Sequence, residues 1–239
     1  MSAVIFSTLF AAISFLAFLA FKRFDRRLTL ASGLVFAAYL GLDDLATSLP
    51  SLSADFQLFG GDWNWSGKIY SLALSLLVIA GLGLRPTAVG LTLQQKNLKT
   101  SFVALLLFTA WGLSLGLIFG PAVPTLETIA FQATMPGLVE ELVYRGIAPA
   151  LLLGLIRGKA PDEGMPWTVI TVTALAFGVW HGLGYSGREF SFDWMSALFP
   201  FIGSLAGGWL RFNSGSLVFP VLAHGIANVA FHLSAFIAA

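Results

Sequence analysis

Long apolar runs separated by short polar or Gly/Pro-containing segments repeat along the whole chain. Each run has roughly 15 to 25 residues, and a helix needs about 20 residues to cross about 30 Å of hydrocarbon. Eight runs can be drawn: Ala3–Phe21, Leu28–Leu42, Ile69–Leu84, Phe102–Gly120, one within Thr125–Ile156, Trp167–Leu183, Trp194–Leu210 and Leu217–Ala238. The pattern predicts an all-α, polytopic membrane bundle of about eight transmembrane helices.

The segments between the runs refine this prediction. The second run ends at the acidic pair Asp43–Asp44, and a polar loop containing Trp63 and Trp65 follows, which is typical of a membrane–water interface. The aspartates are therefore expected in loops, which speaks against an aspartyl pair within the membrane. The more polar piece Thr87–Thr100 is expected to form an interfacial amphipathic segment.

The amino-acid composition indicates that this helical protein is a membrane protein. Hydrophobic residues make up 57% of the 239 positions, charged residues only 10%, and the mean hydropathy is +0.84. No polar block is long enough for a soluble domain. We expect a single membrane domain over residues 1–239, with N-terminal spans in 1–120 and the candidate chemistry in 121–239. The first run precedes its basic cluster, so we interpret it as a retained span and not as a cleaved signal peptide.

Charge predicts the orientation of the bundle. With the N-terminus outside, the inner loops collect ten Lys and Arg, whereas the outer side keeps Lys68 and Arg188. The ten are Lys22, Arg23, Arg26, Arg27, Arg85, Lys96, Lys99, Arg157, Lys159 and Arg211. Inner loops of membrane proteins are enriched in Lys and Arg, so both termini are expected on the non-cytoplasmic side. We expect a multi-pass protein of the prokaryotic plasma membrane, in contact with lipid and without a nucleic-acid partner.

Ionisable residues within the fifth run are the first candidates for chemistry. Glu140, Glu141 and Arg145 lie in a stretch that is otherwise apolar, and charges at that depth usually face a protein interior or a wet cavity. On a helix Glu141 and Arg145 share a face, while Glu140 lies about 100° away with no local cation. We expect Arg145 to hold Glu141 and Glu140 to act as a general base in a cavity. A structural ion pair that joins helices is the alternative.

Two later runs supply partners for a carboxylate. His181 lies near the end of the sixth run, and His224 and Asn228 are four residues apart on one face of the eighth. A packed or interfacial histidine is the alternative interpretation for His181, and His232 is expected to be a satisfied polar residue. The sequence has no His-Glu-x-x-His, Gly-x-Ser-x-Gly or phosphate-binding glycine motif, and no cysteine.

Taken in order, Glu140-Glu141-x-x-x-Arg145, Phe177-x-x-x-His181 and His224-x-x-x-Asn228 resemble the motif series of the CPBP family. This family includes CAAX prenyl proteases and bacteriocin-processing or self-immunity (Abi-type) membrane proteins. The resemblance covers about Pro136–Phe231. It implies an intramembrane endopeptidase for a membrane-associated, lipidated protein or peptide.

The same resemblance implies roles for the site residues. Glu140 with His181 would activate water, His224 and Asn228 would bind the oxyanion, and Glu141 with Arg145 would support them, without a cofactor.

Alternatives stay open at this point. A zinc ion held by Glu140, His181 and His224 is the metal-dependent version of the same protease, although Glu141 would then have to act as base while paired with Arg145. A non-catalytic membrane scaffold or immunity protein, and a small transporter with a carboxylate–histidine proton relay, are candidates of other classes. The absence of an internal repeat argues against the transporter.

Overall fold

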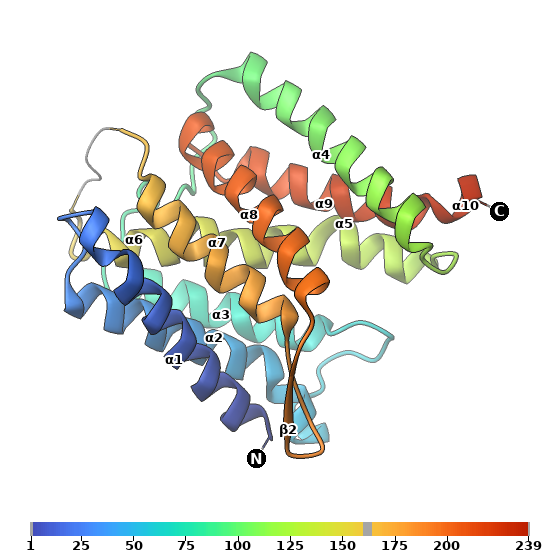
Figure 1. Ribbon diagram of the computed structural model, residues 1–239, viewed down its shortest axis with the longest axis horizontal. Coiled ribbons are helices and arrows are strands. Elements are labelled where there is room, and N and C mark those ends of the chain that lie inside the picture. Colours follow the sequence, from blue (N-terminus) through green and yellow to red (C-terminus); the bar gives the residue numbers. More distant parts are fainter. Residues whose placement is uncertain (1, 160–163, 239) are drawn as a thin grey trace.

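The computed structural model describes residues 2–159 and 164–238, and helices dominate them (Figure 1). The helices are α1 (Ser2–Phe21), α2 (Leu30–Leu52), α3 (Trp65–Gly81), α4 (Leu98–Phe119), α5 (Leu126–Glu141), α6 (Ala148–Leu152), α7 (Trp167–Gly182), α8 (Trp194–Ser214), α9 (Val218–Leu233) and α10 (Ala235–Ala238). Short 3-10 segments are η1 (Lys22–Phe24) and η2 (Ala54–Phe56), and a π-helical segment, η3 (Leu142–Ile147), joins α5 to α6. The prediction of a helical membrane bundle is confirmed.

Four helical segments are long and apolar enough to cross a membrane. They are Ser2–Phe24, Leu30–Leu52, Leu98–Phe119 and Val218–Ile237, and the shorter apolar helices are Trp65–Gly81 and Trp167–Gly182. These lengths and compositions are those of an integral membrane protein. The number of eight crossings stays a prediction.

Helix α2 differs from its prediction. It begins at a capping box formed by Thr29 and Ser32 and runs to Leu52, well past the expected end at Leu42. Asp43 and Asp44 therefore lie inside the helix, 8% and 6% exposed, and not in a loop. Both carboxylates accept hydrogen bonds from other helices, so the helix can carry them into the interior.

Two further segments also depart from the sequence prediction. The piece expected to be amphipathic forms turns and irregular backbone up to Asn97. A two-stranded hairpin, β1 (Leu183–Ser186) and β2 (Glu189–Phe192), joins α7 to α8. Gly187 and Arg188 at its turn both have positive φ, 60° and 70°, as tight two-residue hairpin turns require. The hairpin is a small addition to an otherwise helical fold.

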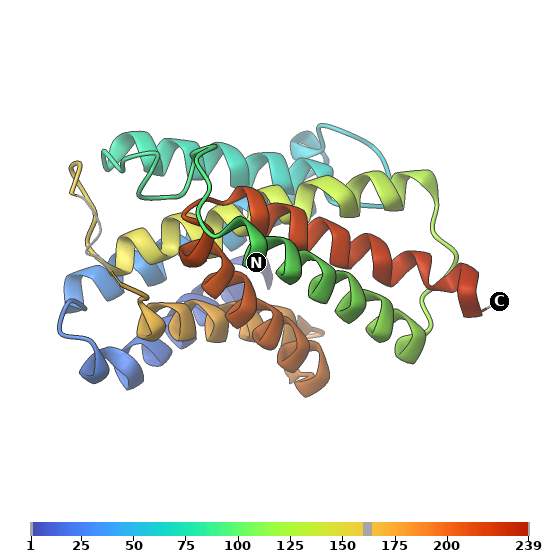
Figure 2. The ribbon, with the colours of Figure 1, turned by 90° about the horizontal axis from the view of Figure 1, so that it is seen from above.

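Small residues bring the helices that carry the candidate site close together. A Cβ at Gly112 or Gly116 of α4 would collide with backbone oxygens of α9, and Gly137 of α5 and Gly225 of α9 lie against each other's helix in the same way. Small residues spaced four apart permit such close backbone approach in membranes. Figure 2 shows α9 lying between α4 and α5. This packing fixes the face of α9 that meets α5.

The loops predicted to be basic meet at one end of the bundle. The Arg157 amide donates to the Leu82 carbonyl, and the Lys96 amide donates to the Ser214 carbonyl. One cavity is lined by Arg27, Lys96 and Arg211 together. At the other end, Glu127 at the start of α5 accepts hydrogen bonds from the 62–65 segment. The structure thus separates a basic end from an end that carries the 53–64 loop and the hairpin (Figure 1).

The basic end is expected to lie in the cytoplasm. A reporter that is active only in the cytoplasm should be inactive when fused after Ala239, because the C-terminus lies at the opposite end. The same reporter fused after Lys159, between α6 and α7, is the matched control and should be active. Activity per amount of fusion protein is the measurement, and the reverse pattern would invert the orientation.

Because α4 and α9 approach each other closely, a side chain added between them should lower the thermal stability of the protein. Gly112→Ala should lower the midpoint of thermal unfolding in detergent, because the added methyl group meets the Ala227 backbone; overpacking of this kind costs about 1–3 kcal/mol. Gly81→Ala is the control, since nothing lies within 4 Å of the Cβ position there. Equal midpoints for the two variants would show that α4 and α9 do not approach each other this closely.

Candidate active site

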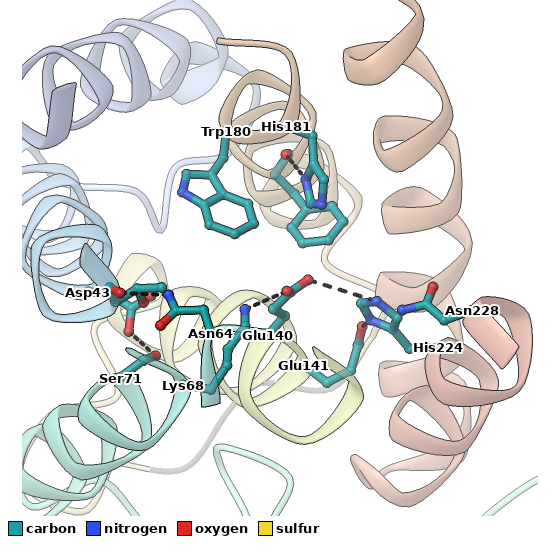
Figure 3. A network of polar contacts seen from close by, with 12 residues as sticks. Asp43, Asn64, Lys68, Ser71, Glu140, Glu141, Trp180, His181, His224 and Asn228 are labelled. Carbon is teal, nitrogen blue, oxygen red and sulfur yellow. Dashed lines mark hydrogen bonds and ion pairs between the residues drawn. The ribbon is translucent and has the colours of Figure 1, made fainter. Parts of the chain in front are cut away.

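The two adjacent glutamates lie at the end of α5, directly before the π-helical segment η3. π-helical turns are rare and often occur at functional sites. Glu140 and Glu141 point to different neighbours: Figure 3 shows Glu140 reaching toward Lys68 and Glu141 toward His224. Their side chains are 9% and 2% exposed, so each charge requires a partner inside the protein.

Glu141 is held from two sides. The Arg145 Nε lies 3.2 Å from Glu141 Oε2, and the His224 Nδ1 lies 2.7 Å from Glu141 Oε1. The Arg145 guanidinium also lies over the Phe177 ring, 4.5 Å from its centroid. Glu141 and Arg145 still contact each other, although the π-helical segment η3 begins between them. Glu141 thus links its own helical segment to α9.

Glu140 pairs with a cation that the sequence did not indicate. Lys68 Nζ lies 2.6 Å from Glu140 Oε1, and its side chain is 8% exposed. Glu140 has no cation on its own helix, as expected, but it is not left free, because Lys68 of α3 pairs with it. Lys68 lies in the first turn of α3, directly before the third apolar run, and the contact joins residues 72 positions apart. Its position at the edge of an apolar run was the only available signal.

His224 lies between the two carboxylates. A carboxylate only accepts hydrogen bonds, so the Nδ1–H of His224 donates to Glu141. The opposite nitrogen, Nε2, lies 3.8 Å from Glu140 Oε2. A dashed line marks this contact in Figure 3. One imidazole ring therefore has its orientation fixed by Glu141 and presents its other nitrogen to Glu140.

His181 lines the same space without touching Glu140. Its Nδ1–H donates to the Phe177 carbonyl at 2.9 Å, which leaves Nε2 as an acceptor. The side chain is exposed, and it lines cavities on both sides of the glutamates. In the part of the chain that the structure describes, no direct hydrogen bond links His181 to Glu140. A water molecule could bind both groups at once.

Asn228 lies one turn beyond His224 and has a partner on α5. Its Nδ2 donates to Gln132 Oε1 at 2.8 Å, and Gln132 is 8% exposed. Sequence reasoning missed Gln132, although Gln132, Pro136 and Glu140 follow at four-residue intervals on one helix face. The amide group of Asn228 keeps a second N–H for another acceptor.

The aspartates of α2 form a second polar cluster beside the glutamates. Asp43 Oδ1 accepts from Ser71 at 2.5 Å, and Asp44 accepts from Trp180 Nε1 at 2.7 Å and from Ser7 at 2.6 Å. Trp180 also lies against Lys68, whose Nζ is 5.3 Å from the centre of its ring. The cluster ties α1, α2, α3 and α7 together around the site.

Two cavities meet at these residues. A polar cavity of about 780 Å³ reaches from Glu140 to the end of α2 and the 53–64 loop. A smaller, apolar cavity of about 180 Å³ lies between α4, α8 and α9, and Glu141 lines it. His181, His224 and Asn228 line both cavities. The junction of a polar and an apolar space is therefore the place where all three of these side chains are available.

The donor groups do not form a metal site as they are arranged. Within residues 2–159 and 164–238, no group of three or more His, Asp or Glu could hold a metal ion. Glu140 Oε1 is occupied by the Lys68 ammonium group, and His224 Nδ1 is occupied by Glu141. A metal bound by Glu140 would have to lie beside a lysine cation, which is electrostatically unfavourable.

Comparison with known proteins gives one match. The family described as "Rce1-like: Type II CAAX prenyl endopeptidase Rce1-like" matches residues 122–230. No curated protein and no solved structure matches the chain significantly. The matched segment contains the three motifs from Glu140 to Asn228, but it excludes Lys68 and the α2 aspartates. The resemblance to the family of CAAX prenyl proteases is confirmed by this match over residues 122–230.

Proposed function

We propose that the protein is an intramembrane endopeptidase that hydrolyses a peptide bond near the C-terminus of a lipidated membrane protein, with Glu140 as the catalytic base. The observation that carries this proposal is the meeting of Glu140, His224 and Asn228 at the junction of the two cavities. A match to a peptidase family over the same segment supports it. The geometry also suits each step of peptide hydrolysis.

Water activation is assigned to Glu140 and His181. Glu140 and His181 both line the polar cavity, and Nε2 of His181 is available to hold a water molecule beside Glu140. Glu140 takes a proton from the water while the oxygen adds to the carbonyl carbon of the substrate. The C–N bond then breaks, and the proton passes from Glu140 to the leaving amine. Water is the only co-reactant, and Glu140 returns to its starting state.

Oxyanion binding is assigned to His224 and Asn228. Asn228 uses one N–H for Gln132 and has the other for the developing oxyanion. His224 can donate from Nε2 when both ring nitrogens carry hydrogen, and Glu141 fixes the ring in place. A preorganised donor of this kind contributes about 3–4 kcal/mol to stabilising the transition state.

The two cavities suit the two parts of a lipidated substrate. The apolar cavity is walled by Phe108, Trp111, Leu115, Phe199 and Phe231, which are suitable contacts for a prenyl chain. The polar cavity offers hydroxyl and amide groups to a peptide backbone. A substrate with its lipid in one and its tail in the other would place the bond between them at His181, His224 and Asn228.

Replacing the base should abolish cleavage. Glu140→Gln keeps the shape of the side chain but cannot take a proton, so we expect turnover of a prenylated peptide to fall by about 10³-fold or more. Cleavage by the purified protein in detergent, followed by mass spectrometry, is the measurement. Glu189→Gln, an exposed change on β2, is the control and should cleave at the wild-type rate.

Loss of an oxyanion donor gives an independent test that leaves the Lys68–Glu140 pair intact. Asn228→Ala should lower kcat by about 10²–10³-fold. Wild-type rates for both Glu140→Gln and Asn228→Ala would contradict the assignment. A folded wild-type protein that cleaves no lipidated peptide would favour a non-catalytic membrane scaffold.

Exhaustive chelation is expected to leave the activity unchanged. The reason is the position of Lys68, whose ammonium group pairs with Glu140 and would repel a metal ion bound to the same carboxylate. The rate of peptide cleavage is measured before and after dialysis against EDTA, with a zinc protease as the positive control for metal removal. Loss of activity that zinc restores would establish the alternative set of Glu140, His181 and His224.

A further inference from the structure

Another cavity lies at the basic end of the bundle, lined by none of the residues of the candidate active site. It has a volume of about 660 Å³ and lies between the end of α6, the end of α8 and the irregular segment before α4. Among the described residues that line it, three are cations, Arg27, Lys96 and Arg211, and none is Asp or Glu. A cavity whose charged groups are all cations favours the binding of an anion.

The guanidinium group of Arg211 is buried beside this cavity without a carboxylate. Arg211 lies in the last turn of α8 and is 4% exposed. Its Nη2 donates to the Ala88 carbonyl at 3.1 Å, whereas Nε and Nη1 have no hydrogen-bond partner among the described residues. The other Lys and Arg that are buried in the described part of the chain, Lys68 and Arg145, each pair with a glutamate. Because a buried charge normally requires a counter-charge, Arg211 calls for an anionic ligand.

The backbone before α4 is fixed around the guanidinium group. Gly90 has a positive φ of 81°, and a Cβ at this position would overlap Nε of Arg211. The Lys96 amide donates to the Ser214 carbonyl at 2.8 Å. The Lys96 side chain then passes over Gly215, with its Cδ 3.6 Å from where a Cβ would lie. Both cations are thus positioned at the C-terminal end of α8.

The rest of the wall suits a phosphate group and a lipid attached to it. Hydroxyl and amide side chains line one part, at Thr87, Thr92 and Gln94. Apolar side chains line another part, at Leu153, Leu155 and Phe212. The planar guanidinium group of Arg211 can donate two hydrogen bonds to a phosphate, and the hydroxyl and amide groups can donate to its remaining oxygens. Arg27 already pairs with Asp25 at 2.6 Å, so the site does not depend on Arg27.

We propose that this cavity binds a phosphate group through Arg211 and Lys96, either the headgroup phosphate of an anionic phospholipid or a phosphate free in solution. The basic end is expected in the cytoplasm, where the membrane leaflet is rich in anionic lipids and basic pockets between helices bind their headgroups. The site is separate from the glutamates and histidines, so it does not depend on the proposed peptidase function.

The test measures the midpoint of thermal unfolding of the full-length protein in a neutral detergent. Phosphatidylglycerol and inorganic phosphate are each titrated; diacylglycerol and sodium chloride of equal ionic strength are the respective controls without phosphate. At about ten times its Kd, a bound ligand should raise the wild-type midpoint by about 3–6 °C. A rise with phosphatidylglycerol alone identifies a lipid headgroup, and a rise with inorganic phosphate identifies a group free in solution.

Variants of the two cations locate the site. Arg211→Gln should abolish the rise, and Lys96→Gln should increase the half-saturating concentration by about tenfold, the effect of one charge-assisted hydrogen bond. Arg85→Gln removes the same charge from an exposed position outside the cavity, and it should keep the wild-type response.

Three results would refute the phosphate site. They are no rise in wild type with either phosphate compound, a rise that the matching control without phosphate reproduces, and a wild-type response in both cavity variants. Lys96 is exposed, so Lys96→Gln decides the question even if Arg211→Gln fails to fold.

Discussion

Two carboxylates on consecutive residues of a buried helix are the constraint around which this protein is built. Each negative charge away from water needs a partner. Arg145 follows Glu141 on the same segment, but the charge on Glu140 is met from α3 and that of Glu141 is met again from α9. Neutralising the pair therefore requires three separate parts of the chain to converge. The same convergence creates the site.

Helix packing makes this convergence possible. His224 can reach Glu141 only because α9 lies close against α5, where Gly137 and Gly225 leave no side chain between the backbones. Glycines of α4 hold the opposite side of α9. On α7, Trp180 and His181 are adjacent, and they face different partners: Trp180 donates to Asp44, and His181 faces the cavities. Close packing and polar contacts thus act on the same helices.

The sequence predicted the parts of this site that depend on local spacing. The pairing of Glu141 with Arg145, the shared face of His224 and Asn228, and the positions of the apolar helices all follow from helical periodicity. Lys68, Gln132, Asp43 and Asp44 were missed because their roles depend on contacts between distant segments. The aspartates were misplaced for a physical reason: a carboxylate ends an apolar run in a hydropathy pattern, but within a bundle it can be satisfied by serine and tryptophan from neighbouring helices. Local rules cannot anticipate such partners.

The position of the polar cavity links the chemistry to the direction in which a substrate arrives. The cavity extends from Glu140 toward the end of α2 and the 53–64 loop, which is the end opposite the basic loops. If the basic end is cytoplasmic, a hydrophilic peptide tail would enter this cavity from the other side of the membrane. The apolar cavity instead lies against α4 and α9, two of the helices that are long and apolar enough to cross a membrane. A lipidated substrate would then approach the site from two directions, with its lipid entering between helices and its peptide tail entering from water.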